Sequence, residues 1–319
     1  MAICVTDITA LEAYRSSGRL LPTLLDKPRT AKLEELSVPS ALMLSESMQS
    51  LGAESTPYHL LFSSPNQAQA RSDIRRHVHE GELPRRSIIK MKKDLLIVSP
   101  EFLFFELASS NAIDEIDHAL IGLELCGTYT LDPDDQSWTG LISTGTTLTS
   151  VKKIDRMLGK LDGRKGIVRA RKALHLVRDA SNSPMETVLV ALLCFPRRLG
   201  GLGLGPVELN RKVPTSAGDR WVDLFFLDQR VGIEYKGRKS HSIEKTGRDD
   251  RRQNKLVGSG VKVLNVWYED LFEDHLFQQL VQDVSNALGV RLRIRSDAFE
   301  QRQRLLRLRL MPAIERFGS

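Results

Sequence analysis

Two short apolar segments in the second half of the chain decide its interpretation: Trp221-Val-Asp-Leu-Phe-Phe-Leu227 and Val231-Gly-Ile-Glu-Tyr-Lys-Gly237. Both are rich in β-branched and aromatic residues, and three residues separate them, so they predict two strands joined by a tight turn. Each also carries charge: Asp223 in the first, Glu234 and Lys236 in the second. A charged side chain inside an apolar strand is unfavourable unless it is paired or binds a metal.

Alternation along the two strands predicts where these charges point. Asp223 is expected to share a face with Trp221 and Phe225, and Glu234 to share a face with Lys236. If the hairpin places Asp223 opposite Glu234 or Lys236, all three converge, whereas a register shifted by one separates them. The simpler alternative is a cross-strand salt bridge between Asp223 and Lys236 on a half-exposed sheet.

The segments around this hairpin predict strands that alternate with helices, which is typical of an α/β protein. Upstream, Ser183-Pro-Met-Glu186 has the pattern of a helix start, with Ser183 as N-cap and Glu186 three residues later. The further elements expected in this half are a helix over 185–195, a basic helix over 244–258, a strand over 261–267, a helix over 271–288, a strand over 290–294 and an arginine-rich helix over 298–310. The glycine-rich stretch 199–206 lacks the context of a nucleotide-binding loop, so we exclude that role.

The first half predicts a smaller α/β module. Its expected elements are a helix over 39–51, a strand over 58–62, β-like residues 88–98, a helix that begins after Ser99, a helix over 114–125 and a loop over 131–149. Two basic helices follow within 149–180. The expected domains are an arm (1–35), a domain for partner or DNA contact (36–148), a basic helical linker (149–180) and a catalytic-type domain (181–319).

Charge is distributed unevenly along the 319 residues. Residues 1–150 hold 13 Lys and Arg against 20 Asp and Glu, whereas 151–319 hold 33 against 20. The basic half therefore predicts a polyanionic partner, foremost nucleic acid, and a basic surface without a ligand is the alternative. Three scattered cysteines indicate reduced thiols in a cytoplasmic protein. We expect neither a membrane-spanning segment nor a secretory leader.

Asp223 followed by Glu234-Tyr-Lys236 resembles the motif of the PD-(D/E)XK nuclease superfamily. Over about 181–290 the chain resembles proteins related to very-short-patch-repair (Vsr-like) endonucleases. Besides the helix start at 183–186 and the hairpin, the matching residues are Gly237, His241, Asp249, Arg252, Leu256 and Gly260. That group often has Asp at the position of Lys236, and lysine restores the pattern of the wider superfamily. The stretch from His77-Val-His79 to Leu103 more faintly resembles an abortive-infection antitoxin region (AbiEi-like).

The resemblance implies a restriction-endonuclease-like mixed sheet flanked by helices, and a metal-dependent endonuclease in phage defence, toxin–antitoxin systems or repair. Its substrate would be DNA, with RNA as the alternative, and the front domain would contact a protein partner. Asp223 and Glu234 are hard oxygen ligands suited to Mg²⁺ or Mn²⁺, and Lys236 can place charge beside the attacking water. The resemblance adds Glu186 to the metal ligands, although the capping box also explains that residue fully.

Several further residues are candidates with simpler alternatives. His241 can position water or contact phosphate, or be an ordinary loop residue. The expected nucleic-acid contacts are Arg238, Lys239, Arg252 and Lys255, together with the helices of 149–180 and the row Arg302, Arg304, Arg307 and Arg309. His77 and His79 could ligate a metal, but no third ligand is visible, which favours ordinary polar roles. The rival function is a nucleic-acid-binding, antitoxin-like regulator whose nuclease fold lacks useful activity.

Overall fold

The computed structural model describes residues 2–16, 24, 26–33, 36, 39–67, 71–110, 112–131, 141–216, 218–236, 254–292 and 296–317. The chain forms two compact units, Met1–Val177 and Arg178–Ser319. Each contains a mixed β-sheet with helices packed around it, which confirms the α/β class. None of the helices in the described ranges combines the length and the hydropathy that crossing a bilayer requires.

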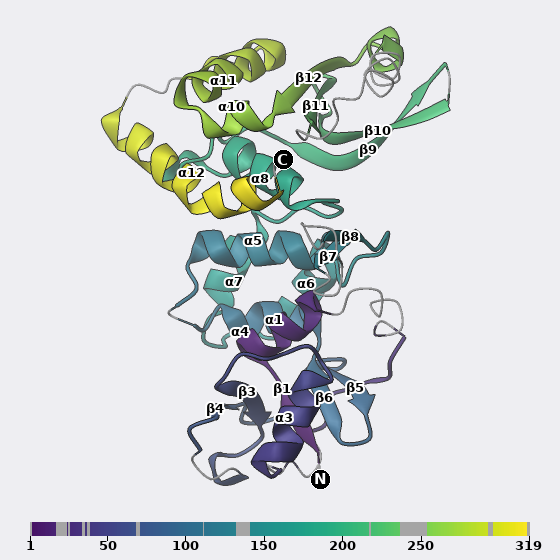
Figure 1. Ribbon diagram of the computed structural model, residues 1–319, viewed down its shortest axis with the longest axis vertical. Coiled ribbons are helices and arrows are strands. Elements are labelled where there is room, and N and C mark those ends of the chain that lie inside the picture. The colour runs from purple at the N-terminus through teal and green to yellow at the C-terminus, as the bar shows by residue number, and fades with distance from the viewer. Residues whose placement is uncertain are drawn as a thin grey trace. The chain divides into compact units, whose positions relative to one another are not determined.

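The N-terminal unit is built on a six-stranded sheet of order β2-β5-β6-β1-β3-β4 (Figure 1). The strands are β1 (Ile3–Val5), β2 (Arg29–Thr30), β3 (Tyr58–Phe62), β4 (Ile74–Val78), β5 (Ile88–Lys92) and β6 (Leu95–Val98). A separate hairpin pairs β7 (Tyr129–Leu131) with β8 (Leu141–Ser143), inside the stretch where the sequence suggests a loop. The sequence suggests an arm over residues 1–35, but β1 lies inside the sheet, paired with β6 on one side and β3 on the other. All three of its apolar residues are buried.

Six helices of the N-terminal unit are described, and one of them begins at the Ser99 cap that the sequence indicates. They are α1 (Asp7–Arg15), α3 (Ala41–Gln49), α4 (Pro100–Leu107), α5 (Glu115–Leu125), α6 (Val151–Leu158) and α7 (Ile167–Leu174). Ser99 accepts a hydrogen bond from Phe102 N at 3.3 Å at the start of α4, and Asp114 caps α5 in the same way. α6 packs on α4 and α7 packs on α5, because each buries an apolar stripe. The basic helix pair thus belongs to this unit instead of forming a separate linker.

This boundary changes the meaning of the charge distribution. The N-terminal unit holds 22 Lys and Arg against 22 Asp and Glu, and the C-terminal unit holds 24 against 18. The strong contrast between the halves of the sequence is therefore mostly a contrast inside the N-terminal unit, where the basic helices α6 and α7 offset an acidic remainder. A net excess of positive charge remains in the C-terminal unit.

A four-stranded sheet of order β12-β11-β10-β9 forms the centre of the C-terminal unit. β9 (Val207–Thr215), β10 (Gly218–Phe226) and β11 (Val231–Lys236) are successive antiparallel strands, and β12 (Lys262–Trp267) lies parallel to β11. β9 is absent from the elements that the sequence indicates, because Arg211 and Lys212 interrupt its apolar alternation. The further strand expected over 290–294 is not formed at residues 290–292, and 293–295 lie outside the described residues.

Helices pack around this sheet: α8 (Pro184–Cys194), α10 (Tyr268–Phe272), α11 (Asp274–Leu288) and α12 (Asp297–Phe317). α8 contacts β10 and α12, and α10 and α11 contact β12. Leu224 and Phe226 are as buried as Phe225, which lies between them on β10. Since neighbouring residues in a strand point to opposite faces, both faces of the sheet are covered at this point.

Two features of this packing bear on functional candidates. Arg307 of α12 is only 6% exposed, lies over the Phe277 ring and donates to the carbonyl oxygens of Leu271 and Phe272. The expectation that Arg307 contacts nucleic acid is therefore wrong, because α12 buries this side chain against α10 and α11.

The glycine-rich stretch has a packing role. A Cβ at Gly200 would lie 2.4 Å from Arg302 O, and one at Gly201 would lie 2.2 Å from Phe195 O. These glycines allow the backbone to approach α12 and the end of α8 closely. Close packing is therefore sufficient to explain why glycine occupies these positions, and no bound nucleotide is needed.

Candidate functional site

The hairpin that carries the charged residues pairs Leu224 with Ile233, Phe225 with Gly232 and Phe226 with Val231. Extending this register by one pair sets Asp223 opposite Glu234. The β10–β11 ladder ends there, although β10 continues beside β9 to Gly218 and β11 continues beside β12 to Lys236 (Figure 1). β10 and β11 therefore stop pairing at the position of the two acids.

Asp223 occupies the end of this ladder. Its Oδ2 accepts a hydrogen bond from the backbone N–H of Tyr235 at 2.9 Å, so the side chain reaches across to β11 next to Glu234. The carboxylate bonds a strand backbone at the point where the strand-to-strand pairing stops. This hydrogen bond holds the Asp223 side chain against the backbone of β11, where it is half-buried.

Alternation along β10 is interrupted at the same position. Val222 and Phe225 lie in one buried cluster, although regular alternation puts residues three apart on opposite faces. Trp221 is 53% exposed, whereas Phe225 is 5% exposed, so the expectation that Asp223 shares one face with both is wrong. The interruption coincides with a gap in the β9–β10 ladder, where Asp223 and Asn210 are not paired and Asn210 has a φ of 48°.

Glu234 and Lys236 lie on one face of β11, as the alternation predicts. Lys236 Nζ donates to Glu234 Oε2 at 2.7 Å, and Glu234 is only 4% exposed. The ion pair forms within β11 instead of across the hairpin to Asp223. Asn265 of β12 is the cross-strand neighbour of Glu234. A nearly buried carboxylate thus has an ammonium group beside it and an amide residue on the next strand.

Glu186 lies at the start of α8 and completes the cap that the sequence indicates. Its backbone N–H donates to Ser183 Oγ at 3.2 Å, and its Oε2 accepts from Asn182 N at 2.7 Å. The same Oε2 accepts from Asn210 Nδ2 at 2.6 Å, so the side chain also contacts β9. Glu186 therefore caps its own helix and reaches the sheet at the strand next to Asp223.

The electrostatics of Glu186 reflect this position. Burial raises the pKa of the Glu186 carboxyl to about 8, the nearby Asp223 carboxylate also raises it, and the hydrogen bonds from Asn182, Asn210 and Ser183 lower it. A buried acid next to a second acid is the environment in which a carboxyl keeps its proton at neutral pH. A cation at this position would relieve the same repulsion.

The spacing of these acids can be compared with a closed metal cage. Among the described residues, one group of three or more His, Cys, Asp or Glu has ligand atoms that all lie within 4.8 Å of one another, and it lies in the N-terminal unit. The carboxylates of Glu186, Asp223 and Glu234 are spaced more widely. The three acids therefore do not form a compact three-ligand cage, and a cation here would be held by one or two of them together with water.

The remaining residues expected at this site are mostly outside the described ranges. Those outside are Arg238, Lys239, His241, Asp249 and Arg252. Lys255 is described and lies exposed on a helical segment over 254–258. Leu256 of that segment packs against Val222 and Phe225, which ties the segment to the sheet.

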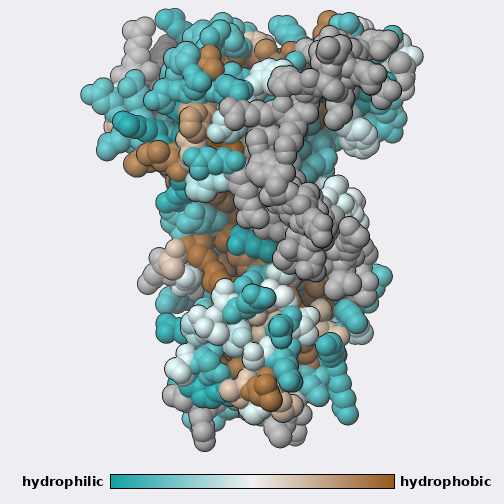
Figure 2. All heavy atoms as spheres, viewed as in Figure 1, coloured by the Kyte–Doolittle hydropathy of each residue, from teal (hydrophilic) through white to brown (hydrophobic). Residues whose placement is uncertain are grey.

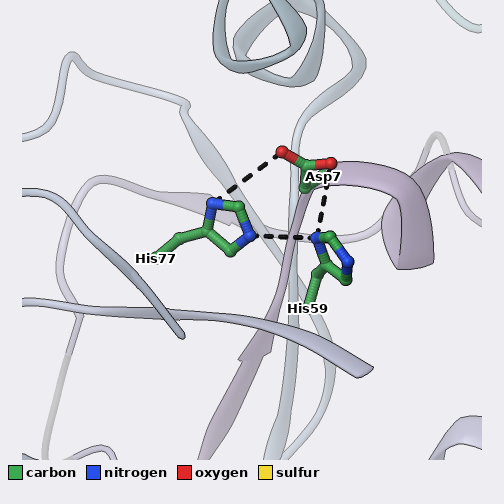
Figure 3. A group of neighbouring side chains, drawn as sticks. All are labelled: Asp7, His59 and His77. Carbon is green, nitrogen blue, oxygen red and sulfur yellow. Dashed lines mark hydrogen bonds and ion pairs between the residues drawn. The ribbon is translucent and has the colours of Figure 1, made fainter. Parts of the chain in front are cut away.

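The group in the N-terminal unit consists of Asp7, His59 and His77 (Figure 3). Sequence reasoning singled out His77 and His79, but the His79 ring lies edge-on to Phe102, with 5.6 Å between ring centroids. The partners of His77 come from 18 and 70 residues upstream, so no local motif contains them. The available signal was the position of His59 within the strand predicted over 58–62, eighteen residues before His77.

The ionisation of this group fits its surroundings. Burial raises the pKa of Asp7, but the hydrogen bond to His59 and the charge of His77 outweigh burial and hold the pKa below its usual value. Burial lowers the pKa of His77, and the neighbouring His59 adds to that effect, whereas Asp7 opposes it. A carboxylate beside imidazole that favours its neutral form is the combination that metal ligation requires.

The basic helix α6 lines a pocket of about 360 Å³ within the N-terminal unit. The residues around it are Arg29, Arg85, Arg86, Glu101, Lys153, Arg156, Met157 and Lys160. Arg29 Nη1 donates to the buried Glu101 at 2.9 Å, which accounts for one of the positive charges. The remaining lysines and arginines make this pocket suited to an anionic group.

Comparisons with known proteins add no assignment to these geometries. No protein-family model matches the chain, and searches of the curated proteins and of the solved structures find no match either. The functional conclusion therefore depends on the residues themselves.

Proposed function

We propose that this protein is a metal-dependent endonuclease that hydrolyses phosphodiester bonds in DNA at the hairpin of the C-terminal unit. The observation that carries the proposal is the end of the β10–β11 ladder at Asp223 and Glu234, with Lys236 2.7 Å from Glu234. Asp223 bonds the backbone of β11 at Tyr235, and the Glu234–Lys236 pair lies on the same strand, where β10 and β11 stop pairing. Phosphodiester hydrolysis needs these functions: a metal ligand set, an activated water and positive charge near the phosphate.

Asp223 and Glu234 are the metal ligands in this proposal. Carboxylates are the ligands that Mg²⁺ and Mn²⁺ prefer, and Mg²⁺ is usually held by one or two of them together with water and substrate phosphate. When bound, the ion would lower the pKa of a coordinated water and neutralise charge on the phosphate. Glu234 is nearly buried and hydrogen-bonded, so its position is fixed before the ion binds.

Lys236 supplies a cation that does not depend on metal. Its ammonium group holds Glu234 in place. Rotation of the lysine side chain can also bring this group towards the negative charge that develops on the phosphate oxygens. The side chain is 15% exposed, so it remains accessible to a ligand at the end of the ladder. The proposed role is electrostatic stabilisation beside the attacking water.

Glu186 is the third acid of the proposed site. A proton on its carboxyl group would compete with a metal ion bound at the same place. Because Asp223 helps to raise its pKa to about 8, a divalent ion near both carboxylates would favour loss of that proton. The contact with Asn210 directs Glu186 Oε2 towards β9 and keeps it close to the sheet. This adds a pH dependence to metal binding that a site of two acids lacks.

The fold and the surface of the C-terminal unit support the proposal. A mixed sheet of three antiparallel strands and one parallel strand, with helices packed around it, fits the restriction-endonuclease-like arrangement that the resemblance implies. The unit carries 24 Lys and Arg against 18 Asp and Glu, and the coloured part of its visible face is mainly hydrophilic (Figure 2). Excess positive charge favours a phosphate backbone as ligand.

The second candidate function is a nucleic-acid-binding regulator without useful activity. The observation that favours it is the basic pocket beside α6 in the N-terminal unit, which can hold a phosphate without any catalytic group. The Glu234–Lys236 ion pair is also complete without a metal, as expected of a structural pair. In this case binding to nucleic acid depends on the pocket, and divalent ions have no effect.

The two functions are separated by a plasmid-nicking assay with Mg²⁺, with Mn²⁺ and with EDTA. The proposed nuclease cleaves with a divalent ion, stops with EDTA and loses activity in Asp223→Asn. The matched control is Asp219→Asn, because Asp219 lies on the same strand but is exposed and paired with Lys212 at 2.6 Å. Binding without cleavage of DNA or RNA under every metal condition would instead establish the regulator.

A further inference from the structure

Asp7, His59 and His77 bring three ligand atoms to one point of the N-terminal unit (Figure 3). His77 Nε2 lies 2.9 Å from His59 Nδ1, His59 Nδ1 lies 3.4 Å from Asp7 Oδ1, and His77 Nδ1 lies 3.8 Å from Asp7 Oδ2. All three side chains point towards the same small volume in Figure 3. They come from the start of α1 and from the neighbouring strands β3 and β4.

The sheet and the start of α1 fix these positions. His59 and His77 lie on parallel strands in which His77 is paired with Leu61, two residues after His59, so both side chains point to the same face of the sheet. Thr6 N donates to His59 O at 3.0 Å, and His59 N donates to Thr9 Oγ1 at 2.9 Å, which holds α1 against β3. The site is therefore assembled by backbone contacts that do not involve the three ligand atoms.

Asp7 adopts a backbone conformation that favours this arrangement. Its φ is 50°, in the left-handed region, which is unusual for a residue other than glycine. Its Oδ1 accepts from the N–H of Ile8 at 2.7 Å, and this bond orients the carboxylate while it faces the two rings. The unfavourable backbone geometry is thus combined with a carboxylate aimed at both histidines.

We propose that Asp7, His59 and His77 bind a divalent transition-metal ion, with Zn²⁺ as the ion best suited to the donor set. Two imidazole nitrogens and one carboxylate form a mixed set that favours Zn²⁺ and related ions over Mg²⁺ and Ca²⁺, which prefer oxygen ligands. At metal–ligand distances near 2 Å, tetrahedral ligands lie about 3.3 Å apart. One ligand atom from each of the three residues lies within 4.8 Å of the other two, so small side-chain rotations suffice to reach that spacing.

The site is accessible from solvent and keeps a coordination position for another ligand. The side chains of His59 and His77 are 21% and 28% exposed, and that of Asp7 is 10% exposed. Three protein ligands leave one tetrahedral position for water or for an anionic ligand, as in sites where zinc takes part in chemistry. The proposal concerns the N-terminal unit alone and is independent of the nuclease proposal, whose ligands are carboxylates of the C-terminal unit.

A titration of the full-length protein with Zn²⁺ tests the site, after treatment with chelator and its removal. We expect saturable binding that His59→Gln, His77→Gln and Asp7→Asn each weaken more than about 100-fold, since loss of an outer partner of a metal ligand already costs 10–100-fold. His275→Gln is the matched control, because His275 is exposed beside Glu273 and lies in the other unit. Asp223→Asn should leave Zn²⁺ binding unchanged.

Spectroscopy of the wild-type protein keeps the test decisive if a variant fails to fold. Co²⁺ bound in place of Zn²⁺ should show the visible absorption of a tetrahedral ion without a thiolate charge-transfer band. X-ray absorption of the zinc form should show two imidazoles in the first coordination sphere. Absence of saturable binding, a thiolate band, fewer than two imidazoles, or unchanged affinity in folded His59→Gln and His77→Gln would each overturn the proposal and leave a metal-free hydrogen-bonded cluster.

Discussion

The two units hold polar clusters of different chemistry and different construction. In the C-terminal unit, Asp223, Glu234 and Lys236 lie on two strands that follow one another in the chain, where the β10–β11 ladder ends. In the N-terminal unit, Asp7, His59 and His77 come from three elements distant in sequence, with a shortest separation of 2.9 Å between ligand atoms. The first cluster offers oxygen ligands and an ammonium group, and the second offers mainly imidazole nitrogen.

Under the two proposals, each unit would bind a different kind of ion. Carboxylates suit Mg²⁺ or Mn²⁺, and Mg²⁺ is usually held by one or two of them together with waters and substrate phosphate. Imidazoles in contact suit a tightly held transition-metal ion. The two sites should therefore respond to different metals and to different substitutions, which makes each a control for the other.

The largest expected effect is loss of cleavage on neutralising one acid of the hairpin. Asp223→Asn keeps the shape of the side chain but removes the charge that holds the metal, and we expect cleavage to fall by about 1000-fold, within the range seen for loss of one electrostatic group at an active site. Glu234→Ala and Lys236→Ala should abolish cleavage as well, with nucleic-acid binding nearly unchanged. The nicking assay measures activity and a gel-shift assay measures binding. If these variants instead unfold the C-terminal unit, the three residues are a structural ion-pair cluster.

The next effect concerns the independence of the two proposed metal sites. His77→Gln should weaken Zn²⁺ binding more than about 100-fold and leave Mg²⁺-dependent cleavage within twofold of wild type, because the two ligand sets share no residue. Asp223→Asn should do the reverse. Calorimetric Zn²⁺ titration and the nicking assay, run on both variants, give the comparison. Loss of cleavage in a folded His77→Gln protein would contradict two independent sites.

The raised pKa of Glu186 predicts that the C-terminal unit loses stability as pH rises. Its folded pKa is about 8 and its ordinary value is 4.5, so between these values the unfolded state loses the proton that the folded state keeps. We expect the free energy of unfolding to fall by about 2 kcal/mol between pH 5 and pH 7. Mn²⁺ should reduce this loss, because the ion replaces the proton.

Hydrogen exchange of peptides from β10 and α8, measured across this pH range, gives the stability of the C-terminal unit. Glu186→Gln should remove the slope, since its amide does not titrate. Asp219→Asn, an exposed site on the same strand, should retain it. A slope of the same size in Glu186→Gln would show that another group is responsible.

The lowered pKa of His118 predicts that the stability of the N-terminal unit changes with pH in the opposite direction. The His118 ring is buried, stacks on Phe104 and bonds the Phe104 carbonyl at 2.7 Å, and burial lowers its pKa to about 4. The unfolded state therefore binds a proton between pH 6.5 and pH 4 that the folded state does not. Stability present above pH 6.5 should be lost as pH falls, by about 1–2 kcal/mol between pH 7 and pH 5.

Hydrogen exchange of α4 and α5 peptides measures this second effect. His118→Gln should flatten the dependence, because glutamine can still donate to Phe104 O but does not titrate. Opposite slopes in the two units would sharpen the comparison between them. Equal slopes would indicate that the units unfold together.

The smallest effect expected concerns nucleic-acid contacts. In the Asp223→Asn background, Lys255→Glu or Arg304→Glu should each weaken DNA binding a few-fold and reduce the slope of log K against log salt by about one, since each phosphate contact releases counterions. Both residues are exposed on the C-terminal unit. Lys153→Glu and Arg156→Glu make the matching change at the basic pocket. If only these last two weaken binding, the N-terminal unit carries the nucleic-acid surface and the regulator is favoured.

Part of this molecule follows from short stretches of sequence. The α/β class, the hairpin of β10 and β11, the caps at Ser99 and Ser183, and the shared face of Glu234 and Lys236 all depend on residues within about twenty positions of one another. Alternation and capping are local properties of the backbone, so the sequence is sufficient to predict them. The hairpin part of the proposed nuclease site lies in this category, whereas Glu186 does not.

Other features depend on packing between distant segments. Examples are the contact of Asn210 with Glu186, the burial of Arg307 against α10 and α11, and the packing of α6 and α7 within the N-terminal unit. The irregularity of β10 at Asp223 also follows from its pairing with β9, and simple alternation misplaces the residues around it.

The sequence alone therefore determined which chemical groups are present, which local elements carry them and which groups on neighbouring strands can meet. Only the tertiary structure decided that Asp7 joins His59 and His77, because their approach depends on the order β1-β3-β4 in the sheet and on the position of α1 against β3. Strand order arises from burial of apolar surface across the whole unit, and no spacing between residues in the chain records it.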